Sequence, residues 1–312
     1  MIAPLAFDFL RFLEEGFVLV EGVFSRREIN LARKACDLTV YDKSYSDWTI
    51  DPIKTFNKDR IKFPTGICAL DKLTANNGLL DCFSKLLGTP DPRLCNAHVF
   101  VRNGYTDHEL GIVANGQWHI DHNTDSFLPP HEDWKTYAYV NCHIFLDEVT
   151  SAHAPMQIVP GSHINVSQEF SHYSNLGLLD SPGNFLTATE LWSSKNVCVT
   201  APAGAVLFYS SLLVHRATRF TDPTLQRPVF TCTMINPTCV GWKRHSWPYS
   251  FTDRRIANEF CAGTTSRLRT ALGWPPPGHS YYTPNTLDSL RYWYPGIDLR
   301  EYERSDKIEK PE

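Results

Sequence analysis

The sequence predicts a mainly β fold with flanking helices, in which short strands form a sandwich or a barrel. Between about residues 94 and 237 the chain consists of short runs rich in β-branched and aromatic residues, separated by Gly, Pro, Asn and Asp. Many short strands with turn residues between them are typical of these two architectures. The clearest runs are residues 95–104, 136–148, 156–163, 196–215 and 227–237.

Two helices are predicted before the β-rich region. Residues 25–35 follow a short strand and a turn, and Ser25 is placed to cap the helix that begins there. The apolar side of this helix is expected to consist of Ile29, Leu31, Ala32 and Ala35. Residues 76–87 carry a second amphipathic pattern. From residue 248 onward we expect helix and loop, with a rigid proline break in Gly-Trp-Pro-Pro-Pro-Gly-His.

We expect a single domain over 1–312, because no internal repeat and no long flexible linker interrupts the sequence. The β-rich core spans about 94–237. It is preceded by an N-terminal helical flank, 1–93, and followed by a C-terminal extension, 238–312, in which no motif indicates chemistry.

Composition excludes several classes of protein. The chain has 312 residues, 42% of them hydrophobic and 21% charged, and no apolar run approaches the ~20 residues of a membrane span. A formal net charge of −4 gives none of the basic excess typical of nucleic-acid binders. The nine cysteines are scattered without a Cys-x-x-Cys pair, and the first residues lack a secretory signal. We therefore expect a cytoplasmic protein with a small-molecule substrate, of unknown oligomeric state.

The segment Gly-Gln-Trp-His-Ile-Asp-His, residues 116–122, contains a His-x-Asp pair. On an extended chain His119 and Asp121 project from the same side, whereas on a helix they would not. Two histidines and one carboxylate with open positions form the ligand set of non-haem Fe(II) oxygenases. Taken alone, the pair could equally be a hydrogen-bonded surface pair, so a further histidine is required.

His215 is the best candidate for the second histidine, because it ends the predicted strand Ala-Val-Leu-Phe-Tyr-Ser-Ser-Leu-Leu-Val-His. Twelve residues later Arg227 begins what is interpreted as the neighbouring strand. A guanidinium binds a carboxylate through two hydrogen bonds, so an arginine at this place suits an acidic co-substrate. Arg216 and Arg219 are the alternatives. Arg216 should face away from the site, and Arg219 could instead meet an acidic substrate.

The predicted strand 136–146 has one face unusually rich in hydrogen-bonding groups. That face consists of Tyr137, Tyr139, Asn141, His143 and Phe145, and the opposite face is ordinary apolar core. Buried polar groups need partners, so the first face is expected to line a pocket filled by water or a ligand.

These motifs, in this order, resemble the phytanoyl-CoA dioxygenase family of Fe(II)- and 2-oxoglutarate-dependent oxygenases. The resemblance runs over residues 15–237 and includes the His-x-Asp pair, Pro160-Gly161-Ser162-His163, the Gly-x-Val-Leu-Phe strand, His215 and Arg227. It implies a double-stranded β-helix, also called a jelly roll, of the cupin type. One departure is Ala154-Pro155, which stands where such sequences usually have Asn-Gly.

The resemblance also implies roles for individual residues. His119, Asp121 and His215 would bind Fe(II), and Arg227 would hold the distal carboxylate of 2-oxoglutarate. His143 would face this co-substrate, with Asn141 and Tyr139 beside it. Thr231 would add a hydroxyl group. Relatives that halogenate have a small residue in place of the carboxylate, so the presence of Asp121 favours oxygenation or a related oxidation over halogenation.

The function that follows is oxidation of an unactivated C–H bond in a small metabolite, as hydroxylation, oxidative cyclisation or desaturation. An amino-acid-derived or other natural-product substrate is preferred. The phosphates of an acyl-CoA usually need several basic side chains, and the negative net charge of the chain does not suit them. Two alternatives remain open: a zinc- or manganese-dependent hydrolase or isomerase on a cupin-like barrel, and a non-catalytic jelly-roll binding protein. The sequence identifies neither the substrate nor the reaction outcome.

Overall fold

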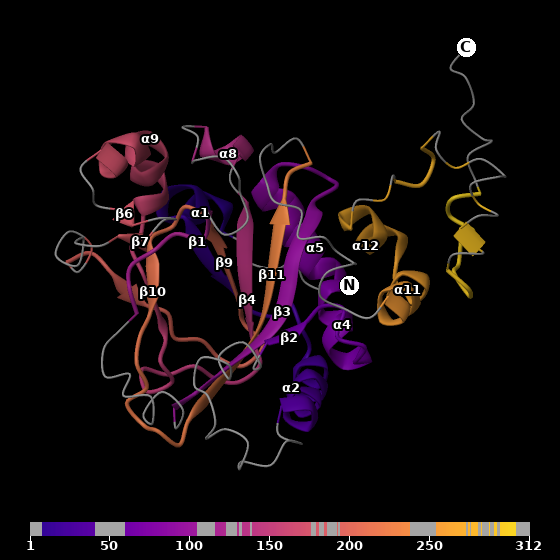
Figure 1. The fold of residues 1–312 in the computed structure, drawn as a ribbon, viewed down its shortest axis with the longest axis horizontal. Coiled ribbons are helices and arrows are strands. Elements are labelled where there is room, and N and C mark those ends of the chain that lie inside the picture. The colour runs from indigo at the N-terminus through magenta and orange to yellow at the C-terminus, as the bar shows by residue number, and fades with distance from the viewer. Residues whose placement is uncertain are drawn as a thin grey trace.

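In a computed structural model, the described residues are 8–40, 60–104, 116–122, 133–137, 139–175, 194–237 and 254–272, with single residues 130 and 192 and shorter stretches at 179–180, 184–185 and between 274 and 303. Two β-sheets and several surrounding helices make up this part of the chain (Figure 1). The helices are α1 (Phe9–Glu15), α2 (Arg26–Val40), α4 (Cys68–Thr74), α5 (Asn77–Leu87), α8 (Trp134–Tyr137), α9 (Ser162–Asn175), α11 (Arg254–Gly263) and α12 (Ser266–Ala271). Within the described residues, no helix is both long enough and apolar enough to cross a membrane.

The larger sheet is antiparallel and has the strand order β1-β9-β4-β11-β3-β2. Its strands are β1 (Phe17–Val20), β2 (Arg60–Lys62), β3 (Arg93–Asn103), β4 (Val140–Phe145), β9 (Val206–Ser210) and β11 (Gln226–Ile235). The smaller sheet has the order β10-β5-β8, and a separate pair is formed by β6 and β7. Their strands are β5 (Met156–Ile158), β6 (Leu179–Asp180), β7 (Asn184–Phe185), β8 (Val197–Cys198) and β10 (His215–Ala217).

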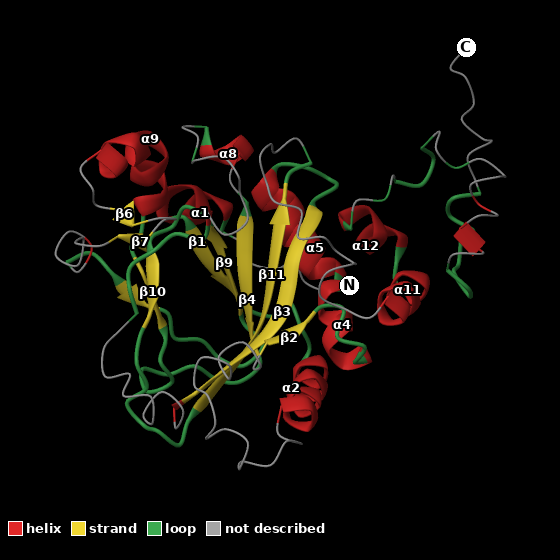
Figure 2. Ribbon diagram, in the orientation of Figure 1, coloured by secondary structure: helices red, strands yellow, loops and turns green. Residues whose placement is uncertain are grey.

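The two faces of the larger sheet are covered differently. Helices α2, α4 and α5 pack on one face, which we call the back face, and form the main apolar core with alternate strand residues such as Ile144, Phe208 and Phe230 (Figure 2). On the opposite, front face, Leu207 and Val229 pack with Met156 and Ile158 of the smaller sheet. The sheets therefore face each other without closing into a barrel, which confirms the jelly-roll prediction.

The predicted helices are confirmed, with one correction. The Ser25 hydroxyl accepts from the backbone N–H of Glu28, and the Glu28 carboxylate accepts from the backbone N–H of Ser25, a reciprocal cap at the start of α2. Ile29, Ala32 and Ala35 are buried as expected. Leu31 was expected on the same side but is 51% exposed, because its position on the helix points away from the sheet.

Three expectations about the strands were wrong. Residues 134–137 form the short helix α8, so the polar strand begins only at Val140. His215 does not end the strand that starts at Val206. Instead the chain leaves the larger sheet at Ser210, turns, and begins β10 in the smaller sheet at His215. Accordingly β11, which carries Arg227, pairs with β3 and β4 and is not the neighbour of β10.

Candidate metal centre

His119, Asp121 and His215 meet between the two sheets. One possible ligand atom from each residue lies within 4.8 Å of the others. Their backbones explain how they meet: His119 and His215 form an isolated antiparallel bridge with two N–H···O bonds of 2.9 Å. The backbone N–H of Asp121 donates to Ser211 O at 3.0 Å, in the turn between β9 and β10. The change of sheet after Ser210 is thus what brings His215 opposite the His-x-Asp pair.

The orientation of both imidazoles suits metal binding. Each Nδ1 lies 2.9 Å from a backbone carbonyl oxygen, that of Gln117 for His119 and that of Leu213 for His215. A carbonyl can only accept, so each Nδ1 carries the proton of the neutral ring and each Nε2 keeps a lone pair. Metal-binding histidines almost always donate their second ring N–H in this way.

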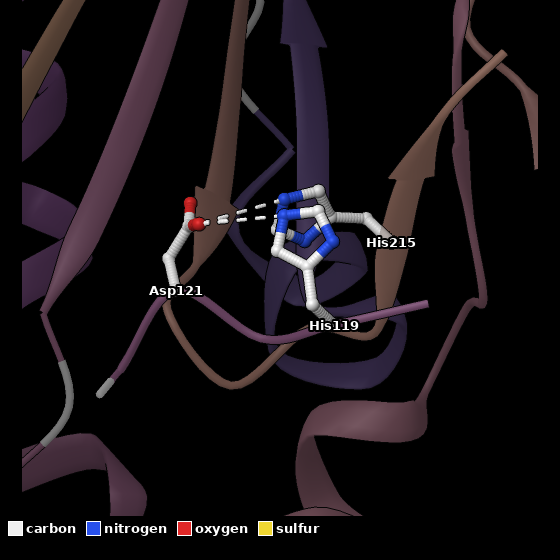
Figure 3. A group of neighbouring side chains, drawn as sticks. All are labelled: His119, Asp121 and His215. Carbon is white, nitrogen blue, oxygen red and sulfur yellow. Dashed lines mark ion pairs between the residues drawn. The ribbon is translucent and has the colours of Figure 1, made fainter. Parts of the chain in front are cut away.

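Both lone pairs point at the same carboxylate oxygen (Figure 3). The Nε2 atoms of His119 and His215 lie 3.8 and 3.7 Å from Asp121 Oδ1. These distances are too long for hydrogen bonds and leave room for an ion at about 2.0–2.2 Å from each atom, the usual length of a metal–N or metal–O bond. The donor set of two imidazole nitrogens and one carboxylate oxygen therefore fits a divalent transition metal such as Fe(II).

The other carboxylate oxygen of Asp121 has its own partners. Asn141 Nδ2 donates to Oδ2 at 2.9 Å, and the Tyr209 hydroxyl donates to Oδ2 at 3.0 Å. The Thr233 hydroxyl in turn donates to Asn141 Oδ1 at 2.6 Å. The Tyr139 hydroxyl donates to the backbone carbonyl of Asp121. Neighbouring strands thus hold the carboxylate at both its side chain and its backbone.

The electrostatics of this group follow from burial and charge. Burial by itself raises the pKa of Asp121, but attraction to the His215 and His119 rings in their protonated form, together with the hydrogen bond from Tyr209, outweighs it, so the pKa is lower than usual. Burial, together with the nearby Asp121 charge, raises the pKa of Tyr209 well above its ordinary value. Asp121 is therefore a carboxylate at neutral pH, and Tyr209 is a protonated phenol that can donate to it.

A cavity of about 350 Å³ opens beside the three residues. Four other residues proposed from the sequence line it: Asn141, His143, Arg227 and Thr231. Tyr139 is not among the lining residues; it is buried behind Asp121. The volume is within the range of small-molecule sites, about 300–1,000 Å³.

Arg227 is buried in the cavity wall, where its Nη1 donates to the carbonyl oxygen of Ala154. Ala154 has a φ of 52°, the left-handed conformation that Asn and Gly adopt most readily. This explains why the resemblance places Asn-Gly at this loop. Burial first, and then the charge of Arg227, lower the pKa of His143 to about 3, so His143 is neutral.

The two alternative arginines lie elsewhere. The Arg216 guanidinium stacks on Trp118 at 4.2 Å from the ring centre, and its Nε donates to Gln157 at 2.7 Å. Arg216 therefore faces away from the cavity, as its place next to His215 predicts. Arg219 is exposed and is not among the residues that line the cavity.

Several cavity residues were missed in the sequence. They are Asn96, His98, Phe100, Cys142, Met156, Tyr209, Ala217 and Thr233. Many of them follow the two-residue alternation that indicated Asn141 and His143. Register joins them into rows across the sheet, because Thr231 lies opposite both His98 and His143, and Thr233 lies opposite both Asn96 and Asn141. The same alternation applied to residues 96–100 and 229–233 would have found these rows.

Solved structures with the same fold were compared with the chain. The epimerase SnoN, described in complex with Fe3+, alpha ketoglutarate and nogalamycin RO, has a TM-score of 0.54 and 15% identity, covering 78% of this chain and 90% of SnoN. The carbocyclase SnoK of nogalamycin biosynthesis, described as non-heme and alpha ketoglutarate dependent, has a TM-score of 0.51 and 20% identity, covering 73% of this chain and 82% of SnoK.

EctD from S. alaskensis, described with 2-oxoglutarate and 5-hydroxyectoine, has a TM-score of 0.50 and 18% identity, covering 73% of this chain and 74% of EctD. At such low identities these likenesses show a shared fold. No curated protein sequence matches the chain significantly. The family model described as Phytanoyl-CoA dioxygenase (PhyH) matches residues 12–223, more than half of the chain. The chain therefore belongs to the phytanoyl-CoA dioxygenase family.

Proposed function

We propose that this protein is an Fe(II)- and 2-oxoglutarate-dependent dioxygenase that oxidises a C–H bond of a small metabolite. His119, Asp121 and His215 are the metal ligands. The observation that carries the proposal is the orientation of their donor atoms: both Nδ1 atoms are held by carbonyl groups, and both Nε2 atoms face Asp121 Oδ1 across a gap that suits an ion. A hydrogen-bonded surface pair would show neither feature.

The cofactors of similar structures support the assignment. SnoN is described with Fe3+ and alpha ketoglutarate, and EctD with 2-oxoglutarate. We extend these cofactors to the present chain because its donor set fits Fe(II) and because a buried arginine lies on the wall of the same cavity. Arg227 is proposed to bind the distal carboxylate of 2-oxoglutarate through its planar guanidinium.

When bound, Fe(II) supplies, with 2-oxoglutarate and O2, the oxidising power that removes hydrogen from a substrate C–H bond. The protein's own residues place the reactants. Arg227 orients the co-substrate, the neutral ring of His143 lies beside it in the cavity wall, and Thr231 adds a hydroxyl on the same wall. Leu207 and Val229 pack between the two sheets next to these groups and exclude water from that end of the cavity.

The cavity also suggests the kind of substrate. Arg227 is the only cation, and Asp121 the only acid, among the described residues that line it. If Arg227 binds the co-substrate and Asp121 binds the metal, the polar side chains that remain for a substrate are Asn96, His98 and Thr233, none of which is an acid, a lysine or an arginine. We infer a small, polar, natural-product-like substrate that enters with an uncharged portion. Hydroxylation, cyclisation and desaturation are all compatible with this site.

The alternatives are less well supported. A hydrolase or isomerase needs no dicarboxylate co-substrate and would leave a buried Arg227 without a role. A non-catalytic relative would be expected to have lost a ligand, whereas all three are present. The acidic net charge supports a small-molecule substrate rather than a nucleic acid. The scattered cysteines support a reducing, cytoplasmic setting.

An anaerobic titration of the metal-free protein with Fe(II) and 2-oxoglutarate would test the proposal. We expect the weak visible charge-transfer band of the Fe(II)–2-oxoglutarate chelate, which needs both additions and disappears in Asp121→Ala. Admission of O2 should then convert 2-oxoglutarate to succinate. Folded protein that binds Fe(II) but gives no band with 2-oxoglutarate would contradict the proposal and bring the hydrolase forward.

A further inference from the structure

We propose that Tyr209 and Asn141 are positioning residues that hold Asp121 Oδ2 and so make Asp121 bind the metal through Oδ1 alone. The inference rests on the proposed function. A carboxylate can use one or both oxygens on a metal, and a second bound oxygen would occupy a position that 2-oxoglutarate or O2 requires. Other groups must therefore keep Oδ2 of Asp121 away from the ion. Neither Tyr209 nor Asn141 is itself a proposed metal ligand.

The distances show that the two carboxylate oxygens of Asp121 have different partners. Oδ1 faces the Nε2 atoms of His119 and His215 at 3.8 and 3.7 Å. Oδ2 lies within hydrogen-bond distance of two donors, Asn141 Nδ2 at 2.9 Å and the Tyr209 hydroxyl at 3.0 Å. Figure 3 shows the same arrangement, with one oxygen directed at both rings and the other turned away. Two donors to one carboxylate oxygen oppose its rotation toward a metal.

The donors are themselves fixed by the larger sheet. Asn141 of β4 lies directly opposite Tyr209 of β9 and also opposite Thr233 of β11. All three side chains are buried, with exposures of 3–6%. Because the Thr233 hydroxyl donates to Asn141 Oδ1, the amide NH2 group must point toward Asp121. The reverse orientation of the amide would set its oxygen against the carboxylate.

Tyr209 also connects the carboxylate with the co-substrate end of the cavity. Its hydroxyl lies 3.2 Å from His143 Nε2. The single phenolic proton goes to the charged acceptor, Asp121, so the hydroxyl oxygen accepts from Nε2–H of His143. His143 then presents Nδ1 as an acceptor. Thr233, Asn141, Asp121, Tyr209 and His143 thus form one hydrogen-bonded chain across three strands.

The experiment is an anaerobic Co(II) titration of metal-free protein, followed by visible absorption. Co(II) reports both affinity and coordination number without turnover. We expect Tyr209→Phe to bind Co(II) about 10-fold more weakly, in line with the 10- to 100-fold effects typical of groups that orient metal ligands. Its band intensity should also change, because Oδ2 becomes able to bind the ion. Thr233→Val should produce a smaller change in the same direction.

Tyr302→Phe is the matched control, because it removes a buried phenol hydroxyl in the C-terminal cluster with Tyr282, Leu287 and Leu299. Its Co(II) affinity and spectrum should equal those of the wild type. Thermal unfolding of each metal-free variant establishes that the protein is folded. If Tyr302→Phe weakens Co(II) binding as much as Tyr209→Phe does, the effect is general destabilisation and the positioning role is wrong.

Chemical rescue gives a second, independent readout. In Asp121→Ala the two donors remain, so added formate should be held by Tyr209 and Asn141 and should restore part of the Co(II) affinity. The rescue should be lost in Asp121→Ala combined with Tyr209→Phe. If the wild type binds Co(II) but Tyr209→Phe is unchanged in affinity and spectrum, the positioning role fails and the proposed function stands. If the folded wild type does not bind Co(II), the proposed function itself fails.

Discussion

The two faces of the larger sheet are made by alternate residues of the same strands, but they serve different ends. On the back face Ile144, Phe208 and Phe230 are fully buried under helices. On the front face their neighbours Asn141 and His143 line the cavity. Strand propensity and register are common to both faces. The faces differ in what covers them, and this difference determines which types of side chain each face carries. Helices on the back face select apolar side chains, whereas the cavity on the front face retains polar groups.

The consequence is that stability and function are encoded one residue apart. Back-face side chains contribute by removing apolar surface from water and by close packing. Front-face side chains contribute little apolar burial and must instead satisfy one another, as Thr233, Asn141 and Asp121 do. Substitutions on the back face should therefore reduce the free energy of unfolding, and substitutions on the front face should reduce ligand affinity.

The largest effect is expected for Phe208→Ala on the back face. Phe208 is 0% exposed and packs edge-on against Phe83 of α5, with ring centres 5.2 Å apart. Truncation leaves a cavity in the core, and the free energy of unfolding should fall by about 3–5 kcal/mol. Urea unfolding measures this fall in the free energy of unfolding. The fraction that remains folded should bind Co(II) with wild-type affinity, and a selective loss of metal binding would break the comparison between the faces.

The next effect is expected for Arg227→Ala on the front side. Removal of the proposed carboxylate partner should weaken 2-oxoglutarate binding by at least about 30-fold, because truncating one member of a buried charge pair costs about 2–5 kcal/mol and each 1.4 kcal/mol is tenfold in affinity. Fe(II) should still bind. Isothermal titration under nitrogen, first of Fe(II) into the metal-free protein and then of 2-oxoglutarate into the Fe(II)-loaded protein, measures both dissociation constants.

Arg216→Ala and Arg219→Ala are the matched controls for Arg227→Ala. Arg216 is held against Trp118 and Gln157, and Arg219 is exposed. Neither substitution should change the affinity for 2-oxoglutarate. Should Arg227→Ala leave that affinity unchanged, the co-substrate must be held by another residue, and the two controls would identify whether it is one of these.

Much of this arrangement could be predicted from local patterns. Alternation along residues 139–146 separated Asn141 and His143 from the core, and Ser25 as a capping residue indicated the start of α2. The His-x-Asp pair and His215 were identified from residue type, order and resemblance, and the structure brings them within 4.8 Å of one another. These signals succeed because each depends on residues close in sequence or on a recurring order of motifs.

The remainder depends on contacts between distant segments. Nothing local indicates that the chain changes sheet between Ser210 and His215, because the apolar run continues through Leu212, Leu213 and Val214. Tyr209 was not identified from the sequence, and its role as a donor to Asp121 becomes visible only when β9 is placed beside β4. Leu31 was misplaced for a related reason: the apolar side of a helix is defined by what covers it.

A third effect is the pH dependence of stability that His163 contributes. This buried imidazole packs in the interior and does not line the cavity. His163 of α9 is 0% exposed, lies edge-on to Trp134, and donates from Nε2 to Leu13 O at 3.2 Å. Burial lowers the pKa of His163 to about 4. The unfolded chain, with a pKa of about 6.5, then binds more protons than the folded protein between these values. This contribution to stability is therefore present at neutral pH and is lost as the pH falls through about 6.5 toward 4.

His163→Gln tests this dependence, because the glutamine amide can still donate to Leu13 O but does not titrate. Between pH 7 and pH 5 the wild type should lose roughly 2 kcal/mol more unfolding free energy than the variant, by proton linkage. Urea unfolding of both metal-free proteins at the two pH values measures the difference, and the other histidines contribute equally to each. Equal losses would mean that His163 is protonated in the folded state or is reached by solvent.

The smallest effect is a gain in stability at the loop that supports Arg227. Ala154 has a φ of 52° and is 0% exposed, and its carbonyl accepts from the guanidinium. The left-handed conformation costs an L-residue roughly 1–2 kcal/mol. Glycine avoids that cost, but it increases the entropy of the unfolded chain and removes a buried methyl group. Ala154→Gly should therefore raise the free energy of unfolding by up to about 1 kcal/mol.

Ala205→Gly is the matched control, because Ala205 is also buried but is absent from the described residues with a positive φ. It should lower the free energy of unfolding by about 1 kcal/mol, since glycine adds flexibility and removes a buried methyl group. Changes of opposite sign in the free energy of unfolding would show that the loop holds Ala154 in a strained conformation. In that conformation its carbonyl oxygen points at Arg227. The same sign for both would mean that Ala154 is held without strain, and the departure from Asn-Gly would then cost the protein nothing.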